Sequence, residues 1–390
     1  MNSTLRVLHL NSMLKGGGTD DQCVKLAAGL KALGHQVWLA GPDGRPFSKL
    51  ARELAVPFHP TPPEGLAKAR FILSAARLAR RERAHIVHGH HGRDLWATAL
   101  VARLSGQRPK IVLTRHMAKS PASWVSRRFL LSQCDALIAV SEFVARVLRE
   151  GVYEPESPEP ERRARPSMLG DHAKIRVVYG GIDTERFQPF ESREQRRAWG
   201  LEPEHFAFGV VGGYDLPRGK GQREFLQAAA RIHEGVPQAR FLLVGGGSMA
   251  GLLRSDIKRL GLTGKAWLTP YCNDMPTAMN AFDCMVLPQV GTEAFGLVVC
   301  EAHACGKPVI ASALDGIPEA FHAGDYGQLV KPESIEELAD AMRAWAAHAL
   351  KNEAERRQLH ERIAERFSLP AAAGRLAAVY QSLLLGGAAS

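Results

Sequence analysis

Two glutamates in the stretch "PQVGTEAFGLVVCEAHACGKPVIASALDGIPE", Glu293 and Glu301, point most directly to chemistry. A glycine-containing turn and the start of a helical run separate them, so both carboxylates can face one cleft at a strand-to-helix junction. The backbone amides of Phe295, Gly296 and Leu297 would point out of the helix N-terminus, where the partial positive charge favours phosphate. Carboxylates accept paired hydrogen bonds from vicinal hydroxyls. The combination predicts a binding site for a sugar nucleotide.

The same stretch resembles a known family. The glutamate-x7-glutamate element "EAFGLVVCE", followed by "GKPVIAS" and "DGIPE", resembles retaining glycosyltransferases of family 4, which have the GT-B fold. The resemblance implies that Glu301 holds the ribose hydroxyls of the donor and that Glu293 contacts hydroxyls of the transferred sugar. It also implies a nucleotide-diphosphate sugar as substrate, taken to be a UDP-sugar, with no cofactor and no metal.

A second element, "VVGGYDLPRGKGQREFLQAAA", resembles the strand, loop and Lys-Gly signature of that family, in which a lysine and an arginine stabilise the departing diphosphate. Lys220 matches the lysine, and Gly212 is the glycine after the strand, expected to contact the donor. A fixed cation lowers the barrier because negative charge accumulates on the leaving group. Gly213 stands where the family has its arginine. Either Arg218 supplies the charge, or Lys220 and backbone amides suffice, or catalysis is impaired.

Two elements of the first half resemble further family features. The run "LKGGGTDDQCVKLAAGL" places glycines between the first strand and a helix. There Gly17 and Gly18 would let the backbone approach the donor phosphate and the acceptor, with a plain tight turn as the alternative. His116 ends the strand "KIVLTRH" at its carboxyl edge. The resemblance places this histidine beside the reacting sugar, where it would position the donor sugar and stabilise developing charge.

The run "HGHHGRD" at residues 88–94 raises the question of a metal site. His88 and His90 alternate on a strand expected to be buried, and neither a completing carboxylate pattern nor an aspartate-x-aspartate motif is present. We therefore expect no metal. The run either lines the cleft or has a structural role, or else His90, His91 or Arg93 contacts the acceptor.

The elements that must position these residues alternate along nearly the whole chain. Short β-rich runs are followed by longer helix-period segments, which predicts βα units covering parallel sheets. We expect an α/β protein with two Rossmann-like, doubly wound domains of the GT-B kind facing across a cleft, with ligand at the carboxyl ends of the strands. The expected parts are an acceptor-binding domain at 1–186, a nucleotide-sugar-binding domain at 187–367, and a C-terminal helix within 368–390 that crosses back to the first domain.

Residues 152–172 interrupt this alternation. The segment is rich in proline and carries an acidic block followed by a basic block, so it can bury little apolar surface. We expect a mobile surface insertion in the first domain, with a partner-docking loop as the alternative.

The net charge of +10 is distributed unevenly. Residues 1–150 carry 23 Lys and Arg against 10 Asp and Glu, whereas the remainder carries 27 against 30. The chain has no recognisable nucleic-acid-binding module, so nucleic acid is not an expected partner. A helix expected within residues 66–83 is basic and amphipathic, which favours either contact with an anionic membrane surface or the solvated face of an ordinary packing helix. Its basic residues are Lys68, Arg70, Arg77, Arg80, Arg81 and Arg83.

The expected location is the cytoplasm, with the inner face of the cytoplasmic membrane as the place of any peripheral contact. The N-terminal sequence lacks the pattern of a secretory signal, and no apolar run is long enough to span a bilayer. The six cysteines form no C-x-x-C pair and are expected to be reduced core thiols.

Together these features predict a metal-independent retaining glycosyltransferase that moves a hexose-like sugar to an acceptor hydroxyl on a lipopolysaccharide core or another envelope glycolipid. The expected partners are a nucleotide-sugar donor and an anionic lipid-linked or saccharide acceptor. Two alternatives stay open: a sugar-nucleotide epimerase, which can share the two-domain fold, and a catalytically silent binding or scaffolding subunit, suggested by Gly213.

Overall fold

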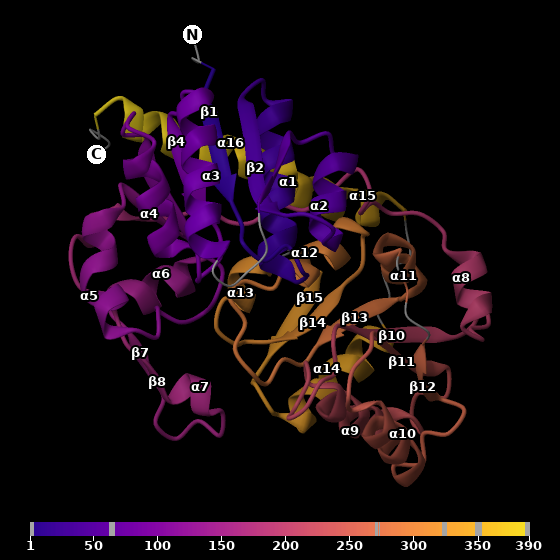
Figure 1. Cartoon of the computed structure of the whole chain (residues 1–390). Coiled ribbons are helices and arrows are strands. Elements are labelled where there is room, and N and C mark those ends of the chain that lie inside the picture. The colour runs from indigo at the N-terminus through magenta and orange to yellow at the C-terminus, as the bar shows by residue number, and fades with distance from the viewer. Residues whose placement is uncertain are drawn as a thin grey trace. The chain divides into compact units, whose positions relative to one another are not determined.

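The computed structural model describes residues 4–61, 67–269, 272, 274–321, 326–347 and 353–386. Two compact units are present (Figure 1). One contains the chain through Gly181 and again from Phe367, and the other is Ile182–Arg366. The side chain of Gln22 accepts a hydrogen bond from the amide of Gly181 and donates one to its carbonyl, both at 2.9 Å. This contact holds Gly181 to the first unit. The chain leaves that unit after Gly181, which is earlier than the expected boundary after residue 186.

The first unit is built on a parallel sheet of seven strands. They are β1 (Arg6–Leu10), β2 (Gln36–Pro42), β3 (Phe58–Thr61), β4 (Ile86–Gly89), β5 (Lys110–Arg115), β6 (Ala136–Ala139) and β9 (Ile175–Val177). Their order across the sheet is β3-β2-β1-β4-β5-β6-β9. The central strands β1 and β4 are almost wholly buried, as expected where helices cover both faces of a parallel sheet.

The helices of this unit come from both ends of the chain. They are α1 (Gly18–Ala32), α2 (Pro46–Glu53), α3 (Ala67–Arg81), α4 (Leu95–Leu104), α5 (Trp124–Gln133), α6 (Glu142–Arg149), α7 (Pro160–Arg163) and α16 (Leu369–Leu384). The C-terminal helix α16 packs against α1 (Figure 1). A Cβ on Gly29 of α1 would lie only 2.9 Å from the Cβ of Ala373, so the glycine permits this close approach.

Helix α3 contains the basic segment singled out in the sequence. Phe71 and Ile72 are buried in a hydrophobic core beneath it, whereas Arg70, Arg77 and Arg80 are exposed. The helix is therefore a packing helix with a solvated basic face, and a membrane contact by that face stays a prediction. Leu66 and the side chain of Lys68 lie outside the described residues.

The proline-rich segment at 152–172 contains a small hairpin. Strand β7 (Val152–Tyr153) pairs antiparallel with β8 (Ala164–Arg165), and α7 lies between them. The buried guanidinium of Arg165 lies 3.1 Å from Glu154 and 5.0 Å from the ring centroid of Phe143. Polar and cation–π contacts therefore stabilise the hairpin, and a large buried apolar surface does not. Its expected mobility and its alternative docking role stay predictions.

The second unit repeats the architecture with six parallel strands. They are β10 (Phe206–Val211), β11 (Ala239–Val244), β12 (Ala266–Thr269), β13 (Cys284–Leu287), β14 (Val309–Ser312) and β15 (Gly327–Val330), in the order β12-β11-β10-β13-β14-β15. Its helices are α8 (Arg193–Ala198), α9 (Gln222–Ile232), α10 (Ala250–Arg259), α11 (Met275–Ala281), α12 (Leu297–Ala304), α13 (Ile317–Ala320), α14 (Ile335–Ala347) and α15 (Glu353–Phe367). Phe208, Phe225 and Phe241 pack together in its core.

Both sheets reverse their strand order at one place, between β1 and β4 in the first unit and between β10 and β13 in the second. Loops that follow the two strands at such a place leave the sheet in opposite directions and open a crevice at the carboxyl edge. The expected pair of doubly wound parallel α/β sheets is confirmed.

The described residues contain no helix that could cross a membrane. All six cysteines lie in the described part of the chain and are free, and each is buried except Cys272, which is half-buried.

We expect His303 on α12 to make the second unit sensitive to acid. The side chain is buried, and burial lowers its pKa from the ordinary 6.5 to about 4. Between these values the unfolded chain binds a proton that the folded chain does not, so the contribution to stability is complete above pH 6.5 and is lost progressively as the pH falls from 6.5 to 4. Between pH 7 and pH 4.5 this loss is about 2 to 3 kcal/mol.

The measurement is the free energy of unfolding in urea at both pH values for the wild-type protein, His303→Gln and His360→Gln. His360 lies in the same unit and is only partly buried, so His360→Gln is the control. His303→Gln should lose less stability on acidification than the other two proteins. Equal losses in all three would contradict the assignment.

Candidate functional site

Lys220 and Glu293 form an ion pair at the carboxyl edge of the second sheet. Lys220 follows β10 and Glu293 follows β13, the two strands at which the order reverses. The Lys220 Nζ lies 2.9 Å from Glu293 Oε2, although 73 positions separate the residues. The side chains are 37% and 22% exposed, so the pair is accessible to a ligand. The fold thus brings together two of the residues that the sequence analysis proposed for donor chemistry.

The backbone around Glu293 is fixed by the loop that follows β14. The amide of Glu293 donates to Asp315 Oδ2 at 3.2 Å, and the amide of Gly316 donates to the carbonyl of Glu293 at 3.1 Å. A Cβ on Gly316 would lie 2.1 Å from the carbonyl oxygen of Ala294, so only glycine allows the two loops to meet. The motif "DGIPE" was noted in the sequence, but this positioning role of Asp315 was not. An Asp-Gly pair in the loop after a strand is the signal that indicates it.

Helix α12 begins immediately after this loop. Gly296 is its N-cap residue, with φ +93°, and Phe295 is buried. The left-handed conformation, which glycine adopts without strain, lets the chain turn from the Glu293 loop straight into the helix. The N-terminus of α12 therefore lies at the carboxyl edge of the sheet, where its backbone dipoles favour an anion. Glu301 lies on the same helix and is half-buried.

Glycines also shape the loop that carries Lys220. Gly212 has φ +139°, and a Cβ on it would lie 3.2 Å from Lys220 Cγ. Gly221, with φ +87°, is the N-cap of α9. It lies so close to the loop after β13 that a Cβ added to it would be 1.8 Å from the Pro288 carbonyl oxygen. The loops after β10 and β13 are thus in direct backbone contact, which brings Lys220 to Glu293.

Arg218 lies near this loop but is engaged elsewhere. Its Nη2 lies 2.8 Å from Glu224 Oε1 and 3.3 Å from Glu333 Oε2. A Cβ on Gly213 would have no neighbour closer than 3.8 Å, so the backbone has room for the arginine that the family has there. Arg218 could contribute its positive charge to a bound donor only if its ion pairs with Glu224 and Glu333 were broken. The role of Arg218 stays a prediction.

In the first unit, His116 ends a line of three histidine rings. His90 Nδ1 lies 3.4 Å from His116 Nε2, and His90 Nε2 lies 2.7 Å from His9 Nδ1. Burial lowers the pKa of His116 to about 3, with Arg115 and His91 as smaller causes. His116 is therefore neutral at physiological pH and can orient a hydroxyl but brings no positive charge. Because a neutral imidazole has one N–H, the tautomers of the three rings are coupled.

His88 and His90 serve as internal hydrogen-bond partners. His88 lies 2.6 Å from the Tyr380 hydroxyl of α16 and 2.7 Å from Thr114 Oγ1, so both ring nitrogens are used. Both nitrogens of the buried His90 are also in contact with histidines, whereas Arg93 is exposed. The acceptor contacts suggested for His90 and Arg93 stay predictions.

His9 and Cys23 were missed as site residues by the sequence analysis. His9, Cys23 and His90 each offer one atom that could ligate a metal, and these three atoms lie within 4.8 Å of one another. Such spacing is compatible with a three-ligand metal site. His9 Nε2 has no hydrogen-bond partner among the described residues. The expected absence of a metal stays a prediction.

The glycine loop after β1 is held by the side chain of Asp20. Asp20 accepts hydrogen bonds from the Gly16 amide at 2.9 Å and from Asn11 Nδ2 at 2.8 Å. Gly17, the N-cap residue of α1, has φ +92°, and a Cβ on Gly17 or Gly18 would have no neighbour within 4 Å. The loop is therefore fixed from one side, and its glycines face open space.

Comparison with known proteins agrees with this geometry. Residues 16–156 match the family described as Glycosyltransferase Family 4, and residues 205–348 match Glycosyl transferases group 1. A relative named D-inositol 3-phosphate glycosyltransferase, from Mycobacterium leprae, is 30% identical over 310 residues, which cover 72% of this chain and 67% of the relative.

Solved structures share the fold over nearly the whole chain. Anabaena Alr3699/HepE in complex with UDP and glucose has a TM-score of 0.76 at 20% identity, covering 97% of this chain and 100% of that one. The lipopolysaccharide outer core galactosyltransferase WaaB has a TM-score of 0.69 at 14% identity, covering 97% and 98%. Because family matches occur in both units and the two parallel sheets have the GT-B architecture, the chain belongs to glycosyltransferase family 4 and is a glycosyltransferase.

Proposed function

We propose that the protein is a retaining, metal-independent glycosyltransferase that moves a sugar from a UDP-sugar to an acceptor hydroxyl. The observation that carries the proposal is the Lys220–Glu293 pair at the carboxyl edge of the second sheet, beside the N-terminus of α12. A cation, a carboxylate and helix-terminal amides are the groups that a diphosphate with an attached sugar requires. The complexes of the Anabaena protein with UDP and with UDP-glucose support uridine as the base.

Lys220 stabilises the diphosphate as the glycosidic bond breaks. Its ammonium is already held in place by Glu293, so phosphate oxygens can replace the carboxylate at Nζ with little reorganisation. Glu293 is then available to the hydroxyls of the transferred sugar, and Glu301 holds the ribose. The roles of Gly17, Gly18 and His116 are proposed from the family resemblance alone.

Transfer with retention proceeds by attack of the acceptor hydroxyl from the face that the diphosphate leaves. The acceptor oxygen forms a bond to the anomeric carbon as the bond from that carbon to the phosphate oxygen breaks. A donor phosphate oxygen takes the acceptor proton, so UDP and the glycosylated acceptor are the products. A neutral His116 fits a positioning role in this scheme, because no protein base is needed.

The acceptor that we propose is an anionic, lipid-linked saccharide of the cell envelope, such as a lipopolysaccharide core, at the inner face of the cytoplasmic membrane. The excess positive charge of residues 1–150 and the exposed arginines of α3 support an anionic acceptor and a peripheral membrane contact. The likeness to WaaB fits this class. Inositol phosphate is the second candidate, because the Mycobacterium leprae relative is named for it.

The donor and the metal requirement can be tested by thermal unfolding with UDP, GDP, ADP and their sugars. UDP compounds should stabilise most, by about 2.7 kcal/mol at about 100 times the dissociation constant. The effect should persist in EDTA and be lost in Glu301→Ala. Elemental analysis of the same preparation reports any ion held by His9, Cys23 and His90. Stabilisation that EDTA abolishes and magnesium restores would refute metal independence.

Transfer itself can be tested with Lys220→Met. We expect kcat to fall about 100- to 1000-fold, because the cation acts on charge that develops in the transition state. Lys258→Met, at an exposed position on α10, is the control and should retain activity.

The assay follows UDP release with a lipopolysaccharide-core acceptor or D-inositol 3-phosphate, and NMR of the product gives its anomeric configuration. Release that depends on acceptor separates a transferase from an epimerase. Inversion of the anomeric centre would refute the retaining mechanism, and full activity of Lys220→Met would refute the assigned cation.

The departure at Gly213 can be tested by restoring the family's arginine. A Cβ at position 213 would have no neighbour closer than 3.8 Å, and the guanidinium of Gly213→Arg would add a second cation to the diphosphate site. We expect the KM for the donor to fall about tenfold, the value of one added charge-assisted hydrogen bond. Arg218→Gln is the companion variant. If Arg218 supplies the missing charge, its loss weakens the donor interaction and Gly213→Arg rescues it. An unchanged KM in Gly213→Arg would contradict the expected gain.

A further inference from the structure

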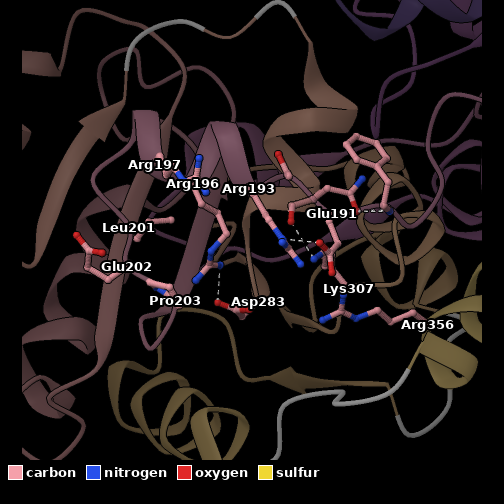
Figure 2. A pocket seen from close by; sticks show the side chains of 13 residues that line it. Glu191, Arg193, Arg196, Arg197, Leu201, Glu202, Pro203, Asp283, Lys307 and Arg356 are labelled. Carbon is pink, nitrogen blue, oxygen red and sulfur yellow. Dashed lines mark hydrogen bonds and ion pairs between the residues drawn. The ribbon is translucent and has the colours of Figure 1, made fainter.

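The second unit contains a cavity of about 600 Å³ (Figure 2). It lies at the edge of the sheet opposite Lys220 and Glu293. Asp283, directly before β13, and Lys307, shortly before β14, lie in its wall. Residues that precede parallel strands lie at the amino edge, whereas donor chemistry is expected at the carboxyl edge. The cavity is therefore separate from the proposed donor site, and its volume is in the range of small-molecule sites.

Positive charge predominates in the wall of this cavity. Five cationic side chains and three carboxylates line it. The cations are Arg193, Arg196, Arg197, Lys307 and Arg356, and the carboxylates are Glu191, Glu202 and Asp283. Two of the three acids are already paired, Asp283 with Arg196 at 2.9 Å and Glu191 with Arg193 at 2.6 Å. Because the cations outnumber the acids, the wall has a net positive charge, which favours an anion in the cavity.

Lys307 is the most unusual member of this group. Lys307 is only 4% exposed. Among the described residues, its Nζ donates to one acceptor, the Asn280 carbonyl at 3.0 Å. An ammonium has three N–H donors, and a buried charge is costly unless its donors are satisfied. Burial and the positive charge of Arg356 and Arg196, against the opposing effect of Asp283, lower the pKa of Lys307 to about 8. An anion in the cavity would supply the missing acceptors and offset this repulsion.

Arg196 gives the site a rigid wall. Its guanidinium donates to the carbonyls of Ala281 and His205 at 2.9 and 2.7 Å as well as to Asp283. Oδ2 of Asp283 also accepts from the Ala207 amide at 2.7 Å, so the backbone holds this carboxylate beside Arg196. Figure 2 shows Arg196 directed at Asp283, with Lys307 and Arg356 nearby.

We propose that this cavity binds the phosphate group of a small phosphorylated molecule. Phosphate offers several acceptor oxygens in one tetrahedral group, which suits an ammonium and a guanidinium together. Arg197, exposed at the rim and with no side-chain partner among the described residues, can reach a ligand without breaking an existing pair. The cavity is larger than a phosphate ion, so the rest of an organic phosphate has room.

The test is calorimetric titration of the full chain with ribose 5-phosphate, inorganic phosphate and, as the uncharged match, ribose. Ribose 5-phosphate should bind and ribose should not. Binding should weaken at least about tenfold in Lys307→Met and in Arg197→Gln, because each removes one charge-assisted contact. Arg231→Gln removes the same charge at an exposed position on α9 outside the cavity and should bind as the wild type does.

Two controls distinguish binding in this cavity from binding at the proposed donor site. Binding should persist in Lys220→Met and in the presence of saturating UDP, whether or not the protein proves to be a UDP-sugar transferase. Tighter binding of ribose 5-phosphate than of inorganic phosphate supports an organic ligand, and equal affinity supports recognition of the phosphate group alone.

Three results would overturn the proposal: no heat of binding with either phosphate, displacement of ribose 5-phosphate by UDP, or equal affinity in Arg197→Gln and the wild type. Arg197 is exposed, so its substitution tests the site even if Lys307→Met fails to fold.

Discussion

The ion pair between Lys220 and Glu293 depends on one topological fact, the reversal of strand order between β10 and β13. The reversal makes the loops after these two strands neighbours at the carboxyl edge. The loops can then touch only because glycine stands at the contact, where a side chain on Gly221 would collide with the Pro288 carbonyl. The loop after β14 fixes the backbone of Glu293 through Asp315. Strand order, glycine and a neighbouring carboxylate together set the position of one charged pair.

The first unit uses the same topology with different chemistry. Its equivalent edge places histidines from β1, β4 and the end of β5 in contact, under cover of α1 and α16. Burial keeps these rings neutral, and their hydrogen bonds run from ring to ring. A polar interior of this kind is stable only when nearly every donor and acceptor is matched, which constrains each ring to a defined tautomer. His9 Nε2 is the atom of this line without a partner among the described residues.

The two edges of the second sheet differ in how their charge is organised. At the carboxyl edge, one accessible lysine is paired with one glutamate and lies near a helix N-terminus. At the amino edge, several arginines and the buried Lys307 surround a cavity whose acids are mostly committed to partners. The first arrangement suits a substrate whose charge changes during reaction. The second suits a ligand that is held by its charge.

The sequence by itself determined the two parallel α/β sheets, because apolar strands alternating with helix-period segments have few other ways to bury their faces. It also placed Glu293, Glu301 and the N-terminus of α12 in one strand-to-helix unit, since residues eight positions apart are linked by local geometry. Lys220 was identified by its motif, but its contact with Glu293 depends on the strand order and was decided by the tertiary structure.

Contacts between residues far apart in the sequence leave no local pattern. The line from His9 through His90 to His116 joins three separate strands, and the cavity around Lys307 joins four helical or turn segments. The engagement of Arg218 by Glu333, 115 positions away, is of the same kind. A local pattern reports which face of an element is apolar. Which charged groups meet, and therefore which are free to act on a ligand, was settled only when the sheets assembled.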